Sequence, residues 1–123
     1  MERRPEIHTI TSFHDNRGDL KVFEEGATLN FTPVRCYVIS EVPLEETRGG
    51  HALSCDEFVA VLHGSVVAVV SNGNGLDEYT LDGRNSGLYV PRNTWFRLER
   101  FAPGSIVAIF ASAKFYDTVY TNY

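Results

Sequence analysis

A single histidine beside flexible residues is the strongest candidate for chemistry in this sequence. His51 follows the residues Arg-Gly-Gly at 48–50, and Leu53 and Glu57 come after it. If this stretch is extended, side chains alternate between its faces, and His51, Leu53 and Glu57 point the same way. Because imidazole titrates near neutral pH, we expect His51 to transfer protons. Glu57 is then either the carboxylate that orients His51 or an exposed carboxylate at the start of a strand.

Arginines lie in or beside several separate strand-like segments: Arg17, Arg35, Arg48, Arg92 and Arg97. If several converge at one end of the fold they would form an anion site, because guanidinium pairs with phosphate in a fixed fork. For Arg92 and Arg97 we favour a solvated surface position. Arg35 shares a strand face with Tyr37 and Ile39, so we expect its aliphatic stem to be covered.

Three aromatic residues, Tyr37, Tyr89 and Trp95, could offer surfaces to a ligand, although most aromatic rings belong to the core. Trp95 follows Pro91 closely at the start of a strand. We therefore expect Trp95 to be the residue that stacks on a base or a sugar.

The elements that must position these residues are short strands with turn signals between them. Apolar and β-branched runs predict strands at Ile7–Phe13, Leu20–Phe23, Arg35–Val42, Glu57–His63, Ser65–Ser71, Glu78–Leu81, Gly87–Val90, Trp95–Arg100 and Ser105–Phe110. Hairpin-type breaks fall at His63-Gly64, at residues 72–75 and at Asp82-Gly83. The continuous apolar runs on either side of Gly64 predict a central hairpin buried on both faces. The pattern indicates an all-β antiparallel jelly-roll barrel, with residues 1–123 as a single domain.

Composition excludes several classes of protein. The chain has 123 residues and a formal net charge of -5, so it lacks the basic field that attracts nucleic acid. The N-terminal residues are not followed by the apolar run of a secretion signal, and no segment is long enough to span a membrane. Two cysteines, Cys36 and Cys55, are too few for a disulfide framework. We expect a cytoplasmic protein with free thiols and no membrane partner.

The spacing from His51 to Gly64 resembles the first signature of the cupin barrels, His-x-His-x3-Glu-x6-Gly, with Leu53 at the second histidine. The second cupin signature, Pro-x-Gly-x2-His, falls on residues 91–96, where Phe96 replaces the third histidine. A metal-dependent cupin needs three nitrogen ligands and usually a carboxylate. With two of the three imidazoles missing, we expect no metal and no cofactor.

A set of motifs in order along the chain resembles the TDP-4-keto-6-deoxyglucose 3,4-ketoisomerases, which are metal-free, WxcM-like cupins. The motifs are Asp15-x-Arg17-Gly18-x-Leu20, Phe31-x3-Arg35-x-Tyr37-x-Ile39, Arg48-Gly49-x-His51-Ala52, Gly64-Ser65, Gly87-Leu88-Tyr89-Val90 with Trp95, and Ala111-Ser112 leading to Tyr116-Asp117 and Tyr120. The resemblance extends from Asp15 to Tyr123. It implies a jelly-roll cupin, usually a homodimer with exchanged strands, that binds a TDP-linked keto-sugar inside the barrel.

The resemblance also assigns roles to residues. The family's first catalytic histidine falls on His51, and its second falls on Leu53, which cannot transfer a proton. The family's arginine turn and Arg-x-Tyr pair fall on Arg17, Arg35 and Tyr37, which we expect near the phosphates and the sugar. The complete expectation is that His51 and Tyr37 are catalytic and that the substrate is bound by Arg17, Arg35, Arg48, Glu57, Tyr89 and Trp95.

Moving a ketone from C4 to C3 of a hexose requires a base that removes a proton from C3 and returns one to C4. It also requires groups that hold the enediolate oxygen, and a donor that shuttles the oxygen-bound proton. One histidine can serve both carbons if they present one face, and the oxygen shuttle would then be Tyr37 or a water. Two alternatives remain open. One is a cupin that binds a nucleotide sugar with different activity or none, and the other is a 3,5-epimerase-like cupin with a tyrosine opposite His51.

Overall fold

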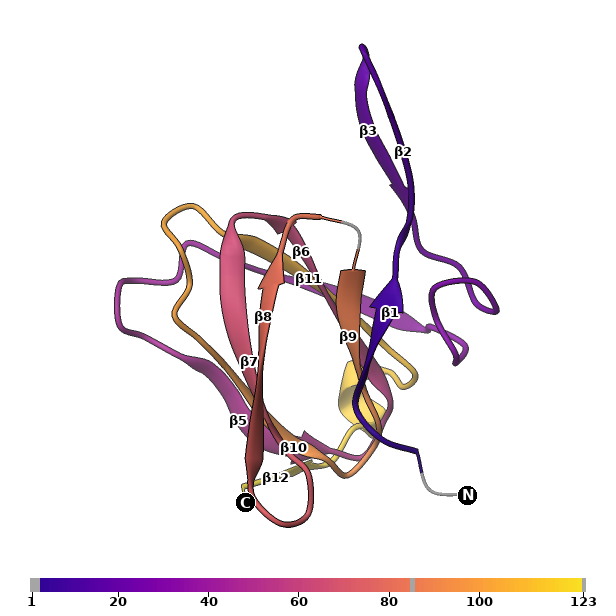
Figure 1. Ribbon diagram of the computed structural model, residues 1–123. Coiled ribbons are helices and arrows are strands. Elements are labelled where there is room, and N and C mark those ends of the chain that lie inside the picture. The colour runs from indigo at the N-terminus through magenta and orange to yellow at the C-terminus, as the bar shows by residue number, and fades with distance from the viewer. Residues whose placement is uncertain (1–2, 85, 123) are drawn as a thin grey trace.

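The computed structural model describes residues 3–84 and 86–122, which fold as two facing antiparallel sheets (Figure 1). The first sheet has the order β1 (Glu6–Thr9), β9 (Ser86–Val90), β6 (Glu57–His63), β11 (Ile106–Ala111) and β4 (Arg35–Ser40). The second has the order β12 (Tyr120–Thr121), β5 (Arg48–Leu53), β10 (Trp95–Glu99), β7 (Ser65–Ser71) and β8 (Leu76–Asp82). A separate hairpin joins β2 (Thr11–Asp15) to β3 (Gly18–Val22), and one 3-10 turn, η1, spans Phe115–Asp117. The predicted all-β jelly roll is confirmed.

The main core lies between the two sheets and is built from alternating apolar side chains. On β6, Val59 and Val61 face this core and are fully buried. Phe58 and Ala60 of the same strand belong to a second cluster with Ile10 and residues of the segment after β3. The strand is therefore buried on both faces, as its continuous apolar run predicts.

The predicted pairing of the two central strands as a hairpin is wrong. β6 pairs with β9 and β11 in one sheet, whereas β7 pairs with β8 and β10 in the other. Gly64 makes the corner between the sheets with a φ of +85°, and a Cβ there would lie 2.9 Å from the Cα of Ser105. The Asp82-Gly83 break likewise leads from β8 in one sheet to β9 in the other. Local turn signals mark where the chain reverses, but they do not distinguish a hairpin from a crossing between layers.

The break at residues 72–75 is the true hairpin, because it connects the paired strands β7 and β8. The backbone N–H of Asn72 donates to the carbonyl of Gly75 at 3.1 Å. The side-chain oxygen of Asn72 accepts from the N–H groups of Asn74 and Gly75, each at 2.8 Å. This side-chain bonding is the usual reason for asparagine in a turn.

The predicted first strand, Ile7–Phe13, is divided into β1 and β2 at the buried Ile10. β1 joins the first sheet beside β9, but β2 and β3 form a hairpin that extends away from the barrel (Figure 1). Phe13 and Leu20 on this hairpin are 61% and 60% exposed. Neither β2 nor β3 pairs with a strand of the two main sheets.

Three segments distant in sequence meet around His51. β5 pairs with β10, so that Phe96 lies opposite His51, and β12 pairs with the other edge of β5, with Tyr120 opposite Leu53. The C-terminal segment runs from η1 to β12, which lies beside β5 (Figure 1). No helix among the described residues is long and apolar enough to cross a membrane.

Candidate functional site

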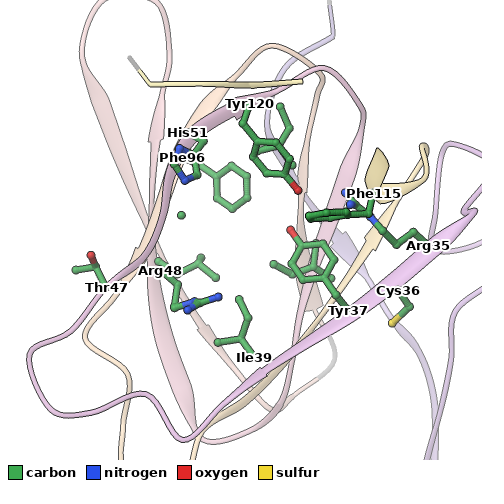
Figure 2. Close-up of a pocket in the computed structure, with 14 residues that line it drawn as sticks. Arg35, Cys36, Tyr37, Ile39, Thr47, Arg48, His51, Phe96, Phe115 and Tyr120 are labelled. Atoms are coloured by element: carbon green, nitrogen blue, oxygen red, sulfur yellow. The ribbon is translucent and has the colours of Figure 1, made fainter. Parts of the chain in front are cut away.

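A cavity of about 630 Å³ opens inside the barrel between β4, β5, β10, β11 and the C-terminal segment (Figure 2). Its wall combines aliphatic and aromatic side chains with a histidine, two arginines and two tyrosines. The lining residues are Arg35, Cys36, Tyr37, Ile39, Thr47, Arg48, Gly49, His51, Leu53, Phe96, Leu98, Ile109, Phe115 and Tyr120. A mostly apolar cavity with a few polar groups is the usual form of a small-molecule site.

The imidazole of His51 lines this cavity and is held by the C-terminal segment. Its Nδ1 lies 2.6 Å from Oδ1 of Asn122, and the edge of its ring meets the ring of Tyr120 with the centroids 5.7 Å apart. An amide oxygen only accepts hydrogen bonds, so Nδ1 carries the hydrogen in the neutral ring. Nε2 then keeps its lone pair, which is the tautomer that a general base requires.

Arg35 supplies a cation with unused hydrogen-bonding capacity. Its guanidinium lies 5.2 Å from the ring centroid of Tyr37 and 5.8 Å from that of Phe115. Nε and Nη2 are buried without a hydrogen-bond partner among the described residues. Burial lowers the pKa of Arg35, but the neighbouring phenols of Tyr120 and Tyr37 outweigh it and the pKa is raised. A charged guanidinium at a cavity wall is suited to receive an anion.

Tyr37 connects the cavity to a buried carboxylate. Its hydroxyl donates to Oε2 of Glu57 at 2.6 Å, and Glu57 is only 1% exposed. Burial raises the pKa of Glu57 to about 7, although the bond from Tyr37 and the charge of Arg35 act in the opposite direction. Burial, with the nearby Glu57, also raises the pKa of the Tyr37 phenol.

Both expectations for Glu57 are wrong: it does not orient His51, and it is buried and not an exposed carboxylate. β5 ends at Leu53, and the turn at residues 54–56 carries the chain into the opposite sheet before Glu57 begins β6. Alternation along one strand therefore does not continue from His51 to Glu57. Asn122 takes the place beside His51 that we expected for Glu57.

Arg48 extends into the cavity beside Thr47 from the start of β5 (Figure 2). Its side chain makes no ion pair within the described part of the chain. The two glycines that follow it adopt φ angles of +85° and +84°, in the left-handed region, and a Cβ on Gly49 would lie 3.2 Å from the carbonyl oxygen of Phe96. Gly49 thus allows close contact between β5 and β10 where Arg48 and His51 enter the site.

Besides Glu57, the structure places three other expected binding residues outside the cavity of their own chain. Arg17 lies in the turn of the β2–β3 hairpin, where it pairs with Asp15 at 2.6 Å. Tyr89 is a core residue: its ring stacks on His8 and its hydroxyl donates to Asp56 at 3.1 Å. Trp95 stands against the guanidinium of Arg97 at 5.4 Å instead of facing the cavity. The alternation of β10 directs Phe96 inward, so its neighbour Trp95 points outward.

Sequence reasoning missed the C-terminal contribution to the site. Tyr120 and Phe115 line the cavity, and Asn122 orients His51 from 71 residues away. Tyr120 belongs to the motifs that resemble the ketoisomerases, which was the available signal. Asn122 carried no signal of its own, because its role depends on the pairing of β12 with β5.

The two positions that the cupin signatures give to further histidines both line the cavity. Leu53 and Phe96 occupy them, next to and opposite His51. Across residues 3–84 and 86–122, no group of three or more His, Cys, Asp or Glu side chains could hold a metal ion. One imidazole with two apolar neighbours does not make a metal donor set.

An antiparallel jelly roll with a histidine in an internal cavity defines a cupin-type protein. The chain matches the family described as "FdtA: WxcM-like, C-terminal" over residues 3–123, and it belongs to this family. It is 33% identical over 107 residues to a TDP-4-oxo-6-deoxy-alpha-D-glucose-3,4-oxoisomerase of Aneurinibacillus thermoaerophilus, covering 86% of this chain and 77% of that one. The resemblance inferred from the motifs is confirmed.

Solved structures of low sequence identity share the fold. The WlaRB TDP-quinovose 3,4-ketoisomerase of Campylobacter jejuni superposes with a TM-score of 0.90 at 24% identity, over 99% of this chain and 95% of that one. QdtA, a sugar 3,4-ketoisomerase of Thermoanaerobacterium thermosaccharolyticum solved with TDP, gives 0.87 at 23%, over 97% and 89%. A dTDP-4-dehydrorhamnose 3,5-epimerase of Bacillus anthracis gives 0.76 at 19%, over 90% and 73%.

Proposed function

We propose that this protein is a 3,4-ketoisomerase of a TDP-linked 4-keto-6-deoxyhexose, with His51 as the base. The observation that carries the proposal is His51 itself, held at Nδ1 by Asn122 in a cavity that the guanidinium-bearing side chain of Arg35 also lines. Membership of the family and the activity of the Aneurinibacillus relative support the choice of substrate.

The chemistry assigned to the site begins at C3 of the sugar. Nε2 of His51 removes the proton from C3, and the carbonyl at C4 takes up the electron pair as an enediolate. Arg35 and Arg48 stabilise the oxyanion and the diphosphate, because guanidinium groups at a site of low dielectric act without reorganisation. Returning the proton from His51 to C4 places the ketone at C3. Tyr37 serves as the group that moves the oxygen-bound proton.

The proposal is tested with TDP-4-keto-6-deoxyglucose in deuterated water. We expect deuterium exchange at C3 and conversion to the 3-keto sugar, both followed by NMR. His51→Asn is expected to abolish both. His63→Asn is the matched control, because His63 is exposed and lies outside the cavity lining. Binding of the substrate without exchange would leave a nucleotide-sugar-binding protein without this activity.

A second candidate, a 3,5-epimerase-like activity, is favoured by Tyr120, which lies beside His51 and lines the same cavity. Such an enzyme pairs a histidine base with a tyrosine acid. The same experiment separates the two, because an epimerase would also exchange the proton at C5. Deuterium at C3 of the substrate and at C4 of the 3-keto product, with none at C5, supports the isomerase.

We further propose that the protein is a homodimer in which the β2–β3 hairpin contacts a second copy. A two-stranded hairpin is marginally stable alone in water, and this one exposes Phe13 and Leu20. In its own chain Arg17 lies in the turn between β2 and β3. This hairpin extends away from the barrel (Figure 1), so Arg17 would meet a substrate in the cavity of that second copy.

The dimer is tested by sedimentation and by complementation. Phe13→Ser with Leu20→Ser is expected to yield monomers, and an unchanged sedimentation coefficient would refute this interface. If Arg17 acts across it, mixing Arg17→Ala with His51→Asn should restore activity that neither variant has alone.

We propose a cytoplasmic location, in keeping with the two cysteines. Cys36 is exposed and Cys55 is buried, and both are free. Free thiols persist in a reducing compartment, which supports this assignment.

A further inference from the structure

We infer that Glu57 is the inner end of a proton relay that reaches the cavity through the hydroxyl of Tyr37. The relay moves the oxygen-bound proton of the sugar between O3 and O4, which is the task that Leu53 cannot perform. This inference rests on the proposed isomerase function and adds Glu57 to its machinery.

The geometry of the pair is that of a relay. Tyr37 lines the cavity, whereas Glu57 lies behind it and does not. Their oxygens are 2.6 Å apart, and Glu57 is 1% exposed. The second carboxylate oxygen, Oε1, is buried and has no hydrogen-bond partner in the described chain. Tyr37 is therefore the route by which a proton from the cavity can reach this carboxylate.

The surroundings of Glu57 favour uptake of a proton. Glu57 lies between Val90 of β9 and Ala111 of β11, both apolar. Arg35 and Tyr37 face it from β4, and the thiol of Cys55 lies nearby on the preceding turn. A buried carboxylate without an ion pair is costly in its charged form. Burial outweighs the effect of Arg35, and the pKa of Glu57 is raised to about 7, which suits a group that must both give and accept a proton near neutral pH.

The reaction balances with the relay starting in its protonated form. His51 first removes the proton from C3 and leaves the enediolate. Tyr37 then gives its hydroxyl proton to O4 and takes the proton of Glu57, which leaves an enediol and a carboxylate. In the second half, O3 gives its proton to Tyr37, which passes its own proton to Glu57, while His51 protonates C4. Both His51 and the Tyr37–Glu57 pair return to their initial states, and no other reactant is needed.

The experiment compares Glu57→Gln and Tyr37→Phe with the wild type. Glutamine keeps the size of the side chain but cannot relay a proton, and phenylalanine removes the connecting hydroxyl. For each variant we expect formation of the 3-keto product to fall about 100-fold or more, the range for loss of a general acid-base group. Deuterium exchange at C3, which depends on His51, should fall much less. Glu99→Gln is the matched control, because Glu99 is partly buried and pairs with Arg97 outside the cavity.

A pH profile separates a relay from a purely structural role. Because the relay starts protonated, kcat of the wild type should decline as pH rises through about 7, and both variants should lack this limb. Product formation by Glu57→Gln within about threefold of the wild type, or an unchanged declining limb, would overturn the relay and leave the isomerase standing. If Glu57→Gln does not fold, Tyr37→Phe decides the question by the same two measurements. Absence of C3 exchange in the wild type would instead refute the proposed function itself.

Discussion

At the scale of the residue, the site depends on pairs of side chains in which one partner orients the other or fixes the position of its proton. His51 is oriented by Asn122, and Tyr37 is bonded to the buried Glu57. Each of the two proposed catalytic groups thus has a hydrogen-bond partner outside the cavity that determines where its proton lies. Such partners carry much of the function of a site although they do not touch the substrate.

Asn122 is expected to affect turnover through the tautomer of His51. Asn122→Ala removes the acceptor at Nδ1, so the hydrogen is no longer confined to that nitrogen. We expect kcat/KM to fall about 10- to 100-fold, as on loss of other histidine-orienting partners. Asn122→Asp retains an oxygen acceptor and should keep more activity than the alanine variant. Equal activity of all three proteins, measured by steady-state kinetics, would contradict this role.

Because of Glu57, the folded protein is expected to become less stable as the pH rises. Its pKa is about 7 in the folded protein, against an ordinary value of 4.5 for a glutamate side chain, so the folded state binds more protons between these values. The contribution of Glu57 to the free energy of unfolding is therefore greatest below pH 4.5. It declines by about 3 kcal/mol as the pH rises to above 7. Urea denaturation at several pH values should show this decline in the wild type but not in Glu57→Gln. Parallel pH profiles would contradict the assignment.

At the scale of the element, the site exists because strands from both sheets and the C-terminal segment meet at one end of the barrel. β4 contributes Arg35 and Tyr37, β5 contributes Arg48 and His51, and β12 contributes Tyr120. The corner at Gly64 between β6 and β7 sends the chain from one sheet to the other. Because the chain crosses between the sheets at this corner, strands of the two sheets can face one another across the cavity.

Gly64 is expected to tolerate no side chain. Gly64→Ala would strain a positive φ and place its Cβ 2.9 Å from the Cα of Ser105, so we expect at least about 2 kcal/mol of destabilisation. Gly73→Ala is the matched control: its φ is +92°, but nothing lies within 4 Å of the added carbon. It should cost about 1 kcal/mol. Equal losses in thermal or chemical unfolding would show that the close approach is not what matters.

At the scale of the whole molecule, a net charge of -5 gives an anionic ligand no general attraction. Binding of a nucleoside diphosphate must therefore come from the local cations of the cavity. Arg35 and Arg48 are the two arginines that line it.

TDP is expected to raise the melting temperature, because a ligand of the folded state stabilises it by mass action. At a TDP concentration of about 100 times the Kd, the free energy of unfolding rises by roughly 2.7 kcal/mol. For a domain of this size, that raises the melting temperature by several degrees. Arg35→Met should lose most of the shift. Arg84→Met should keep it, because Arg84 is exposed and lies outside the cavity. No shift with the wild type at millimolar TDP would count against the proposed substrate class.

Sequence alone was sufficient for the class of fold and for placing His51 on the inside of it. Strand runs, turn residues and the period-two alternation are local properties, and they correctly predicted an all-β barrel with residues 51 and 53 facing its interior. The motif set also predicted the family correctly.

Only the tertiary structure decided which strands pair and which side chains meet. His51 and Asn122 are 71 residues apart, and Tyr37 and Glu57 are 20 apart on strands separated by β11. Alternation predicted Glu57 beside His51, but the chain changes sheets between them, so Glu57 joins Tyr37 instead. Local patterns determine the face that a side chain takes within one strand. The identity of its neighbour depends on strand order and register, which are set when both sheets bury their apolar faces together.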